Sequence, residues 1–431
     1  MNTLFDLCGI LHRKGYCQLS WEKLMIFRRT IFKALGLAAI LSQITAYNVI
    51  AADNIKVGIL LPLSGSVAPI GVNNRRGHEF AVEEINANGG IKSLGGAKLE
   101  MIDGDTQGKP EIGITELQKL ERKGVVAIMG AYQSGVTFPV TQVSEKLRVP
   151  FIDPVAIADS ITSRGFKYLF KVSPQASWYA RDQIRFVKEA SEKVGKPVKS
   201  VVLLHEDTLF GKSTGDGQVA AAEQFGIKVL DRIAYPKDSA DMTATMAKIK
   251  QMNPDAVLLV SYLSDAVLIT KTMKELGIDA PIVGTSAGHI DPAYISTLGK
   301  DADYTFTVGE WATDVKKKGV PEISKRFKEK FGVDMNGHAA ETYMSTYVLA
   351  DALERAGSTD RKKLRDALAE TKLCGDQNIL PYDCVRFDQT GQSPEAQLII
   401  MQIIDGQHKT VWPFESASAA LEWPVPAWST R

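Results

Sequence analysis

Residues 284–288 read Gly-Thr-Ser-Ala-Gly and match the G-x-S-x-G pattern, in which the central serine is the nucleophile of a hydrolase. Ser286 follows an apolar segment that we expect to be a strand, and His338 and His408 lie downstream, where such enzymes carry their base. However, Pro292 interrupts the long helix that should follow, and no glycine-rich oxyanion segment is present. We therefore expect a strand-end loop that lines a cleft, and we keep a secreted serine hydrolase using Ser286 as an alternative.

A second segment, Phe210-Gly211-Lys212-Ser213-Thr214, is similar to a phosphate-binding loop. Such a loop needs a further glycine at position 206, where this chain has Glu206 followed by Asp207. The segment is therefore interpreted as an ordinary turn from a strand into a helix. No spacing of His, Cys, Asp or Glu indicates a metal site, and no cofactor motif is found.

The segment from Gly130 to Pro154 has the features of an anion-binding site. An apolar run ends in small residues, and Ser134-Gly135 leads directly into a helical pattern. The first amides of a helix point outward and attract negative charge, and a serine hydroxyl beside them can donate to a carboxylate. The alternative is that Ser134 only caps the helix.

Composition predicts an ordinary globular protein. The chain has 431 residues, 45% hydrophobic and 23% charged, which is long enough for two domains. Its 51 basic and 50 acidic residues nearly cancel and only six histidines occur, so nucleic-acid binding has no support.

The N-terminus has the pattern of a secretory signal peptide over 25–52, with basic residues, an apolar run and small residues before Asp53. Residues 1–24 are then interpreted as a mis-assigned extension before a start at Met25. Without 1–52, the basic residues fall from 51 to 45 and the acidic residues from 50 to 48, a net charge of −3. In the oxidising periplasm we expect the remaining cysteines, Cys374 and Cys384, to form a disulfide.

Alternating apolar and amphipathic segments predict an α/β fold of two doubly wound lobes with parallel sheets. Lobe 1 is expected to hold 53–173 and about 305–384, lobe 2 to hold 174–304 and about 385–415, with a tail at 416–431. The expected strands are 55–61, 97–102, 125–129, 151–153, 200–204, 228–233, 256–260, 281–283, 396–404 and 410–412, and the expected helices are 72–88, 111–123, 178–194, 242–252, 321–331 and 339–356.

The order of several segments resembles the Leu/Ile/Val-binding family of periplasmic solute-binding proteins, which are type I binding proteins that serve ABC importers. The resemblance rests on "IKVGILLPLSGSVAPIG", "AVEEINANGGI", "GAYQSGVTFPVTQVSEKLRVPFIDP", "HEDTLFGKSTGDGQVAAAEQFGIKV", "DMTATMAKIKQMNPDAVLLV" and "DGQHKTVWP". It covers Asn54 to about Trp412. It implies two lobes joined by three crossings that close on a small molecule.

The resemblance also implies a ligand site. In the first lobe it places the ligand carboxylate at Ser134 and at the main chain of Val155, Ala156 and Ile157. In the second lobe it points to Phe210, Tyr262 or Leu263, and Ser286. The strand before Ser134 would end in small residues so that the ligand can approach the backbone.

Three departures from the family pattern concern the ligand, and the first is Phe210, where the family often has a tyrosine. Ile157 replaces a threonine, and Ser286 stands where amino-acid-binding members have an acid that neutralises the amino group. A buried ammonium without a carboxylate is unfavourable, so Asp265 or Asp291 would have to substitute, or the ligand would be an aromatic or aliphatic acid.

The resemblance implies a periplasmic substrate-binding protein without catalysis. Its partners would be a small carboxylate-bearing ligand, by family default a branched-chain amino acid, and ABC permease subunits. Binding of aromatic acids or short amides is the alternative. We expect a monomer.

Overall fold

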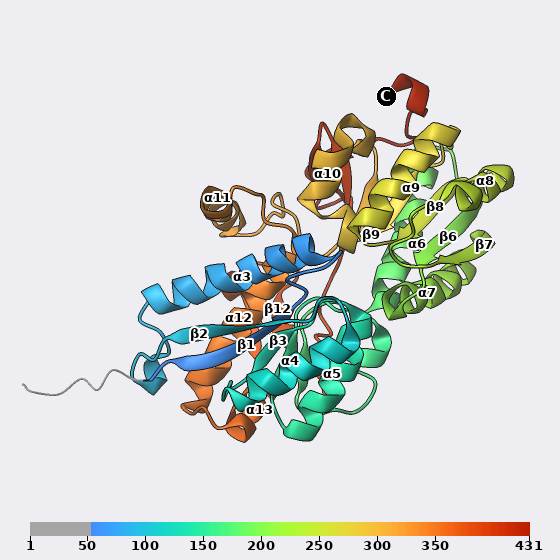
Figure 1. Cartoon of the computed structure of the whole chain (residues 1–431). Helices are drawn as coiled ribbons and strands as arrows, with labels where there is room; N and C mark the ends of the chain where they lie inside the picture. Colours follow the sequence, from blue (N-terminus) through green and yellow to red (C-terminus); the bar gives the residue numbers. More distant parts are fainter. Residues whose placement is uncertain (1–52) are drawn as a thin grey trace, which may run out of the picture. The chain divides into compact units, whose positions relative to one another are not determined.

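The structure, a computed structural model, describes residues 53–431, and these form one compact unit. The expected signal peptide and the extension before it lie outside the described residues. Within 53–431 the predicted α/β fold of two lobes is confirmed, because each lobe is built on its own large sheet covered by helices (Figure 1), and a two-stranded sheet is added to these.

The first lobe is built on a parallel five-stranded sheet of order β2-β1-β3-β4-β5. Helices α4 and α5 cover one face, whereas α3 and α12 pack together on the other. Apolar side chains fill both interfaces, as binary patterning of buried parallel strands predicts. The elements of this lobe are β1 (Ile55–Leu61), α3 (Ala68–Ala87), β2 (Leu99–Asp105), α4 (Pro110–Arg122), β3 (Ile128–Gly130), α5 (Ser134–Leu147), β4 (Phe151–Asp153), β5 (Leu169–Lys171), α11 (Val320–Phe331), α12 (Gly337–Ala356), α13 (Arg361–Ala369), β11 (Lys372–Cys374) and β12 (Cys384–Arg386).

The second lobe contains a seven-stranded sheet of order β14-β13-β10-β9-β8-β6-β7. Strands β6 to β10 are parallel, and the late strands β13 and β14 add to the edge in antiparallel pairs. The elements are α6 (Ala176–Lys193), β6 (Ser200–Glu206), α7 (Leu209–Phe225), β7 (Lys228–Tyr235), α8 (Thr243–Met252), β8 (Ala256–Val260), α9 (Leu263–Leu276), β9 (Ile282–Thr285), α10 (Pro292–Leu298), β10 (Phe306–Gly309), β13 (Ile399–Ile404) and β14 (Gln407–Trp412).

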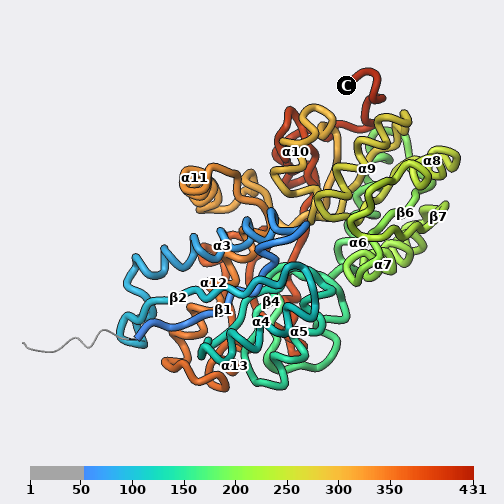
Figure 2. The backbone as a smooth tube through the Cα atoms, viewed as in Figure 1, coloured from blue at the N-terminus to red at the C-terminus, as the bar shows by residue number. Residues whose placement is uncertain are grey.

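The chain passes between the lobes three times: between β5 and α6, between β10 and α11, and between β12 and β13 (Figure 2). The expected boundaries differ from the strand pairing at two points. Strand β10 pairs with β9, so the second crossing follows Gly309 rather than residue 304. Gln392 bridges Lys171 of β5, which keeps the chain beside the first sheet beyond residue 384.

The C-terminal segment is packed rather than a separate tail. Trp423 lies 5.3 Å from the ring of Phe306 and 6.3 Å from that of Phe186, centroid to centroid. The Trp428 indole donates to the carbonyl of Ile278. Residues 416–431 therefore extend the core of the second lobe.

Two further features concern the chain as a whole. Cys374 and Cys384 are joined by a disulfide that closes the β11–β12 hairpin in the first lobe. Over residues 53–431, no helix combines the length and the apolar character that crossing a membrane requires.

Candidate ligand-binding site

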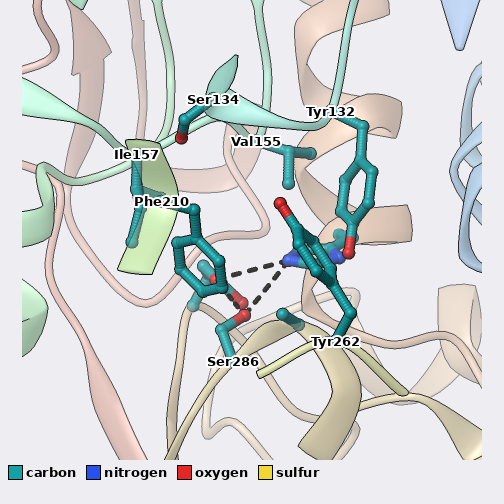
Figure 3. Close-up of a pocket in the computed structure, with 10 residues that line it drawn as sticks. Tyr132, Ser134, Val155, Ile157, Phe210, Tyr262 and Ser286 are labelled. Carbon is teal, nitrogen blue, oxygen red and sulfur yellow. Dashed lines mark hydrogen bonds and ion pairs between the residues drawn. The ribbon is translucent and has the colours of Figure 1, made fainter. Parts of the chain in front are cut away.

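A small cavity lies where strand ends and helix starts of both lobes meet (Figure 3). Its volume is about 20 Å³, room for about one water molecule. A ligand of amino-acid size therefore requires the lining to move. The lining consists of Tyr132, Ser134, Val155, Ile157, Phe210, Tyr262, Ser286, Ala287, Glu310 and His338.

Ser134 lies at the start of α5 in the first-lobe wall of this cavity. It is the first residue of the helix and makes no capping hydrogen bond, because Gln133 occupies the cap position. Instead the Ser134 hydroxyl accepts a hydrogen bond of 3.2 Å from the Ala158 amide. Its proton therefore remains available to an acceptor in the cavity.

The loop after β4 supplies the main-chain part of the same wall. Asp153 Oδ1 accepts from the amides of Val155 and Ala156 at 3.1 and 2.8 Å, which fixes the loop. Val155 and Ile157 line the cavity, whereas Ala156 does not. The Ile157 carbonyl accepts from the Ala176 amide at the first crossing, so this loop is tied directly to the junction between the lobes.

Two buried charged residues, Asp153 and Lys171, lie on neighbouring strands next to this loop. Burial raises the pKa of Asp153 to about 7, which the charge of Lys171 opposes. Burial likewise lowers the pKa of Lys171 to about 8. Lys171 also donates to the carbonyl of Pro174 at the crossing.

Gly130 has a different role from the one expected. A Cβ at this position would lie 2.0 Å from the carbonyl oxygen of Leu60, and the residue has a φ of 153°. The glycine is therefore required by the close approach of β3 to β1, not by the approach of a ligand. The expectation that this strand ends in small residues for the ligand was wrong for Gly130.

Aromatic rings form much of the remaining wall. Phe210, in the first turn of α7, lies 5.5 Å from the ring of Tyr262, which precedes α9. Tyr132 from the first lobe lies 6.0 Å from Tyr262 and 5.5 Å from the ring of His338. These spacings are those of packed aromatic pairs. The rings enclose the cavity from both lobes (Figure 3).

Ser286 belongs to a polar cluster at the second-lobe side. Its hydroxyl donates to Glu310 Oε1 at 2.6 Å, and its Oγ lies 3.1 Å from His338 Nε2. The Tyr179 hydroxyl also donates to Glu310 Oε1. Ser286 has a φ of 40° and a ψ of −135°, a strained conformation that turns its side chain toward the cluster.

The cluster does not have the geometry of a catalytic triad. In a triad the acid contacts His Nδ1 while the serine contacts Nε2. Here Glu310 Oε1 lies 3.7 Å from Nε2 of His338, and it is Glu310 that accepts the hydrogen bond from the serine hydroxyl. Within the described chain, Nδ1 of His338 has no hydrogen-bond partner. The other candidate base, His408, instead binds the carbonyl of His289.

Comparison with known proteins supports the assignment of this architecture. Residues 54–407 match the family model described as periplasmic binding protein. The chain belongs to the periplasmic binding protein family. It is 30% identical over 409 residues to Leu/Ile/Val-binding protein homolog 8 of Brucella suis, covering 92% of this chain and 98% of that protein. It is 29% identical over 401 residues to homolog 7 of Brucella melitensis, covering 91% and 98%.

Solved structures of this fold include proteins with different ligands. The branched-chain amino acid binding protein LivJ of Streptococcus pneumoniae, in complex with isoleucine, is 25% identical, with a TM-score of 0.72 and coverage of 82% of this chain and 97% of that one. A solute-binding protein of R. palustris in complex with benzoate is 19% identical, with a TM-score of 0.72 and coverage of 83% and 95%.

The binding protein's cavity contains most of the residues expected from the sequence. Ser134, Val155, Ile157, Phe210, Tyr262 and Ser286 all line it, whereas Ala156 and Leu263 do not. Their contacts with a ligand remain a prediction.

The two acids expected to substitute for the missing one do not line the cavity. Asp291 caps α10 by accepting from the Ala293 amide at 2.8 Å. Asp265 Oδ2 accepts from the Asp238 amide. Glu310, which the sequence reasoning missed, lines the cavity instead. A signal was present, because Glu310 directly follows the buried apolar strand Phe306–Gly309 and strand ends of α/β sheets are where ligands bind.

The segment similar to a phosphate loop contains its own anion. The Glu206 carboxylate accepts from the amides of Thr208 and Gly211 at 2.7 and 2.6 Å, at the start of α7. A side-chain carboxylate therefore occupies the position that a phosphate takes in a nucleotide-binding loop.

Proposed function

We propose that this periplasmic binding protein captures a small carboxylate-bearing ligand, by family default a branched-chain or related amino acid, and presents it to an ABC permease. One observation carries the proposal: Ser134, the first residue of α5, lines one cavity together with Val155, Ile157 and aromatic rings. A hydroxyl donor and helix-end amides bind a carboxylate, and the rings exclude water from an apolar group.

The ligand is expected to be held by closure of the lobes. Ser66 of the first lobe donates to Asp238 of the second at 3.0 Å, and the Asp159 amide donates to Ser213 Oγ at 3.3 Å. These contacts at the rim must open for a ligand to enter. Small-angle scattering should show compaction at saturating ligand, and identical profiles with and without ligand would count against hinge closure.

A thermal-shift screen tests the ligand class. The protein is unfolded and refolded to remove bound ligand, then heated with amino acids, aromatic acids, short amides and dicarboxylates. A ligand that binds only the folded state raises the melting temperature in proportion to the logarithm of its concentration over its dissociation constant. Stabilisation by no carboxylate in the panel would contradict the proposal.

Aromatic acids or short amides are the alternative ligands. Tyr132, Phe210 and Tyr262 favour this alternative, because a ring can stack among them. A solved relative of the same fold binds benzoate. In the screen, stabilisation by aromatic acids or amides without stabilisation by aliphatic amino acids would favour it.

We further propose that the protein is exported through the signal peptide at 25–52, acts in the periplasm as a monomer and does not catalyse a reaction. Intact-mass analysis of the exported protein should give a chain that begins near Asp53. A mass that retains residues 1–24 would contradict the start at Met25. Sedimentation analysis checks the monomer.

A serine hydrolase is the alternative from another class. The strained backbone of Ser286 and its 3.1 Å contact with His338 favour it. The proton of Ser286, however, is directed to Glu310 rather than to His338, which does not activate the oxygen. A fluorophosphonate probe should leave the native protein unlabelled, and labelling of Ser286 would support the hydrolase.

A further inference from the structure

Glu310 is a carboxylate that the proposed carboxylate-binding wall does not use. It directly follows β10, is 2% exposed and lines the cavity. Burial of a carboxylate is unfavourable unless hydrogen bonds or an opposite charge compensate it. The surroundings of Glu310 therefore determine what it can bind.

Two hydroxyls donate to one oxygen of Glu310, and the other oxygen lies at a helix start. Oε1 accepts from the hydroxyls of Tyr179 and Ser286. Oε2 lies close to Gly337 at the start of α12, because a Cβ there would be 2.4 Å from it. A helix start stabilises negative charge. Oε2 nevertheless has no hydrogen-bond partner within residues 53–431.

No cation of the described lining neutralises this carboxylate. The lining contains no lysine or arginine. Burial lowers the pKa of His338, the one basic side chain within reach, so its ring is neutral near pH 7 even though Glu310 opposes this shift. Lys237 lies 6.0 Å from the Tyr262 ring but pairs with Asp238, and Lys171, which does not line the cavity, donates to the carbonyl of Pro174.

Aromatic rings surround the same side of the cavity. Tyr132 and Tyr262 pack edge to face with their ring centroids 6.0 Å apart, and the Tyr132 hydroxyl has no partner in the described chain. Aromatic faces attract cations, most strongly where water is excluded. A buried carboxylate beside aromatic rings is a suitable environment for a positively charged nitrogen.

We propose that Glu310 binds a cationic nitrogen of the ligand, so that the ligand is a zwitterion with its carboxylate at Ser134 and its nitrogen between Glu310 and the tyrosine rings. This inference rests on the proposed carboxylate-binding function and narrows it. The acid that amino-acid-binding members carry at the position of Ser286 is then supplied by Glu310, directly after the neighbouring strand β10, and the Ser286 hydroxyl holds it in position. The inference also disfavours simple aromatic acids as ligands.

The test compares each amino acid with the acid that lacks only its amino group. The full chain, refolded to remove bound ligand, is screened by thermal shift with the 20 amino acids and their deaminated acids. Affinities of the stabilising pairs, for example L-leucine with 4-methylpentanoate or L-phenylalanine with 3-phenylpropanoate, are then measured by calorimetry. We expect the amino acid of a pair to bind at least about 30-fold more tightly.

Glu310→Gln should remove that preference. It should weaken binding of the amino acid at least about 30-fold and change binding of the deaminated acid less than about threefold. A merely structural role would weaken both ligands equally. Asp291→Asn is the matched control, since asparagine also caps a helix and Asp291 does not line the cavity. It should leave both affinities unchanged.

The possible failures are distinguishable. If deaminated acids bind as tightly as amino acids in the wild type, or if Glu310→Gln weakens both alike, the inference is wrong and the carboxylate-binding function stands. If no carboxylate of either kind binds, the proposed function is wrong and the inference falls with it. If circular dichroism shows that Glu310→Gln does not fold, the inference is tested by the wild type alone, from the affinity of each amino acid relative to its deaminated acid.

Discussion

The Ser134 face of the pocket, with Val155 and Ile157, comes from one stretch of the first lobe, whereas the Glu310 face gathers side chains from separate segments. Ser134 and Ile157 owe their positions to a helix start and a strand end in one continuous stretch of chain. Glu310 and Ser286 meet across neighbouring strands, and His338 reaches them from α12 of the first lobe. The first face suits any carboxylate, so selection among ligands falls to the second.

The largest expected effect concerns the first face alone. Gly130→Ala should lower the free energy of unfolding by about 3 kcal/mol, because its Cβ would collide with the Leu60 carbonyl and β3 must move. Urea unfolding measures the change. Gly135→Ala is the control: a Cβ there meets no atom within 4 Å, so the change should stay within about 1 kcal/mol. Equal losses in both variants would contradict the close-approach argument.

Removal of the disulfide should lower stability without changing ligand affinity. The disulfide closes a ten-residue separation in a hairpin of the first lobe, away from the cavity lining. Replacing both Cys374 and Cys384 by alanine should lower the free energy of unfolding by about 2–3 kcal/mol, by loop entropy. Ligand affinity should not change. Alkylation with mass analysis should find no free thiol in the native protein.

Acid sensitivity should be present in both lobes. Burial lowers the pKa of His78 in α3 and of His289 after β9 to about 3. Between pH 6.5 and 3 these histidines are protonated in the unfolded chain but remain neutral in the folded one. Stability is therefore lost as the pH falls. From pH 7 to pH 5 each histidine should lower the unfolding free energy by about 2 kcal/mol. Urea unfolding of His78→Asn and His289→Asn at pH 7 and pH 5 measures this loss. If a variant loses as much unfolding free energy between the two pH values as the wild type, the replaced histidine does not contribute to the acid sensitivity.

The smallest expected effect compares one serine on each face. Ser134→Ala should weaken binding of every carboxylate ligand about tenfold, through loss of one hydrogen bond to a charged group. Ser286→Ala should weaken binding only about threefold, and only for ligands with a cationic nitrogen, because its hydroxyl acts through Glu310. Calorimetry with a paired amino acid and deaminated acid distinguishes them. A larger loss in Ser286→Ala than in Ser134→Ala would reverse the assigned roles.

Much of the fold was predictable from the pattern of apolar residues. Strands β1, β4 and β8 begin and end where the sequence predicts. Strands β5 and β10 were missed because three or four residues carry no periodicity of their own and, unlike β4 between Pro150 and Pro154, neither strand is bounded by prolines. With β10 missing, the residue after it, Glu310, could not be recognised as a strand-end residue.

The sequence by itself determined the class of the fold and the residues of the proposed carboxylate-binding face, because both depend on local order: apolar runs form strands, and a serine after a strand begins a helix. Only the tertiary structure decided the second face. Glu310, Ser286 and His338 are 24 to 52 residues apart along the chain. Sheet pairing and the return of α12 bring them together, and no local pattern encodes which distant side chains share a cavity.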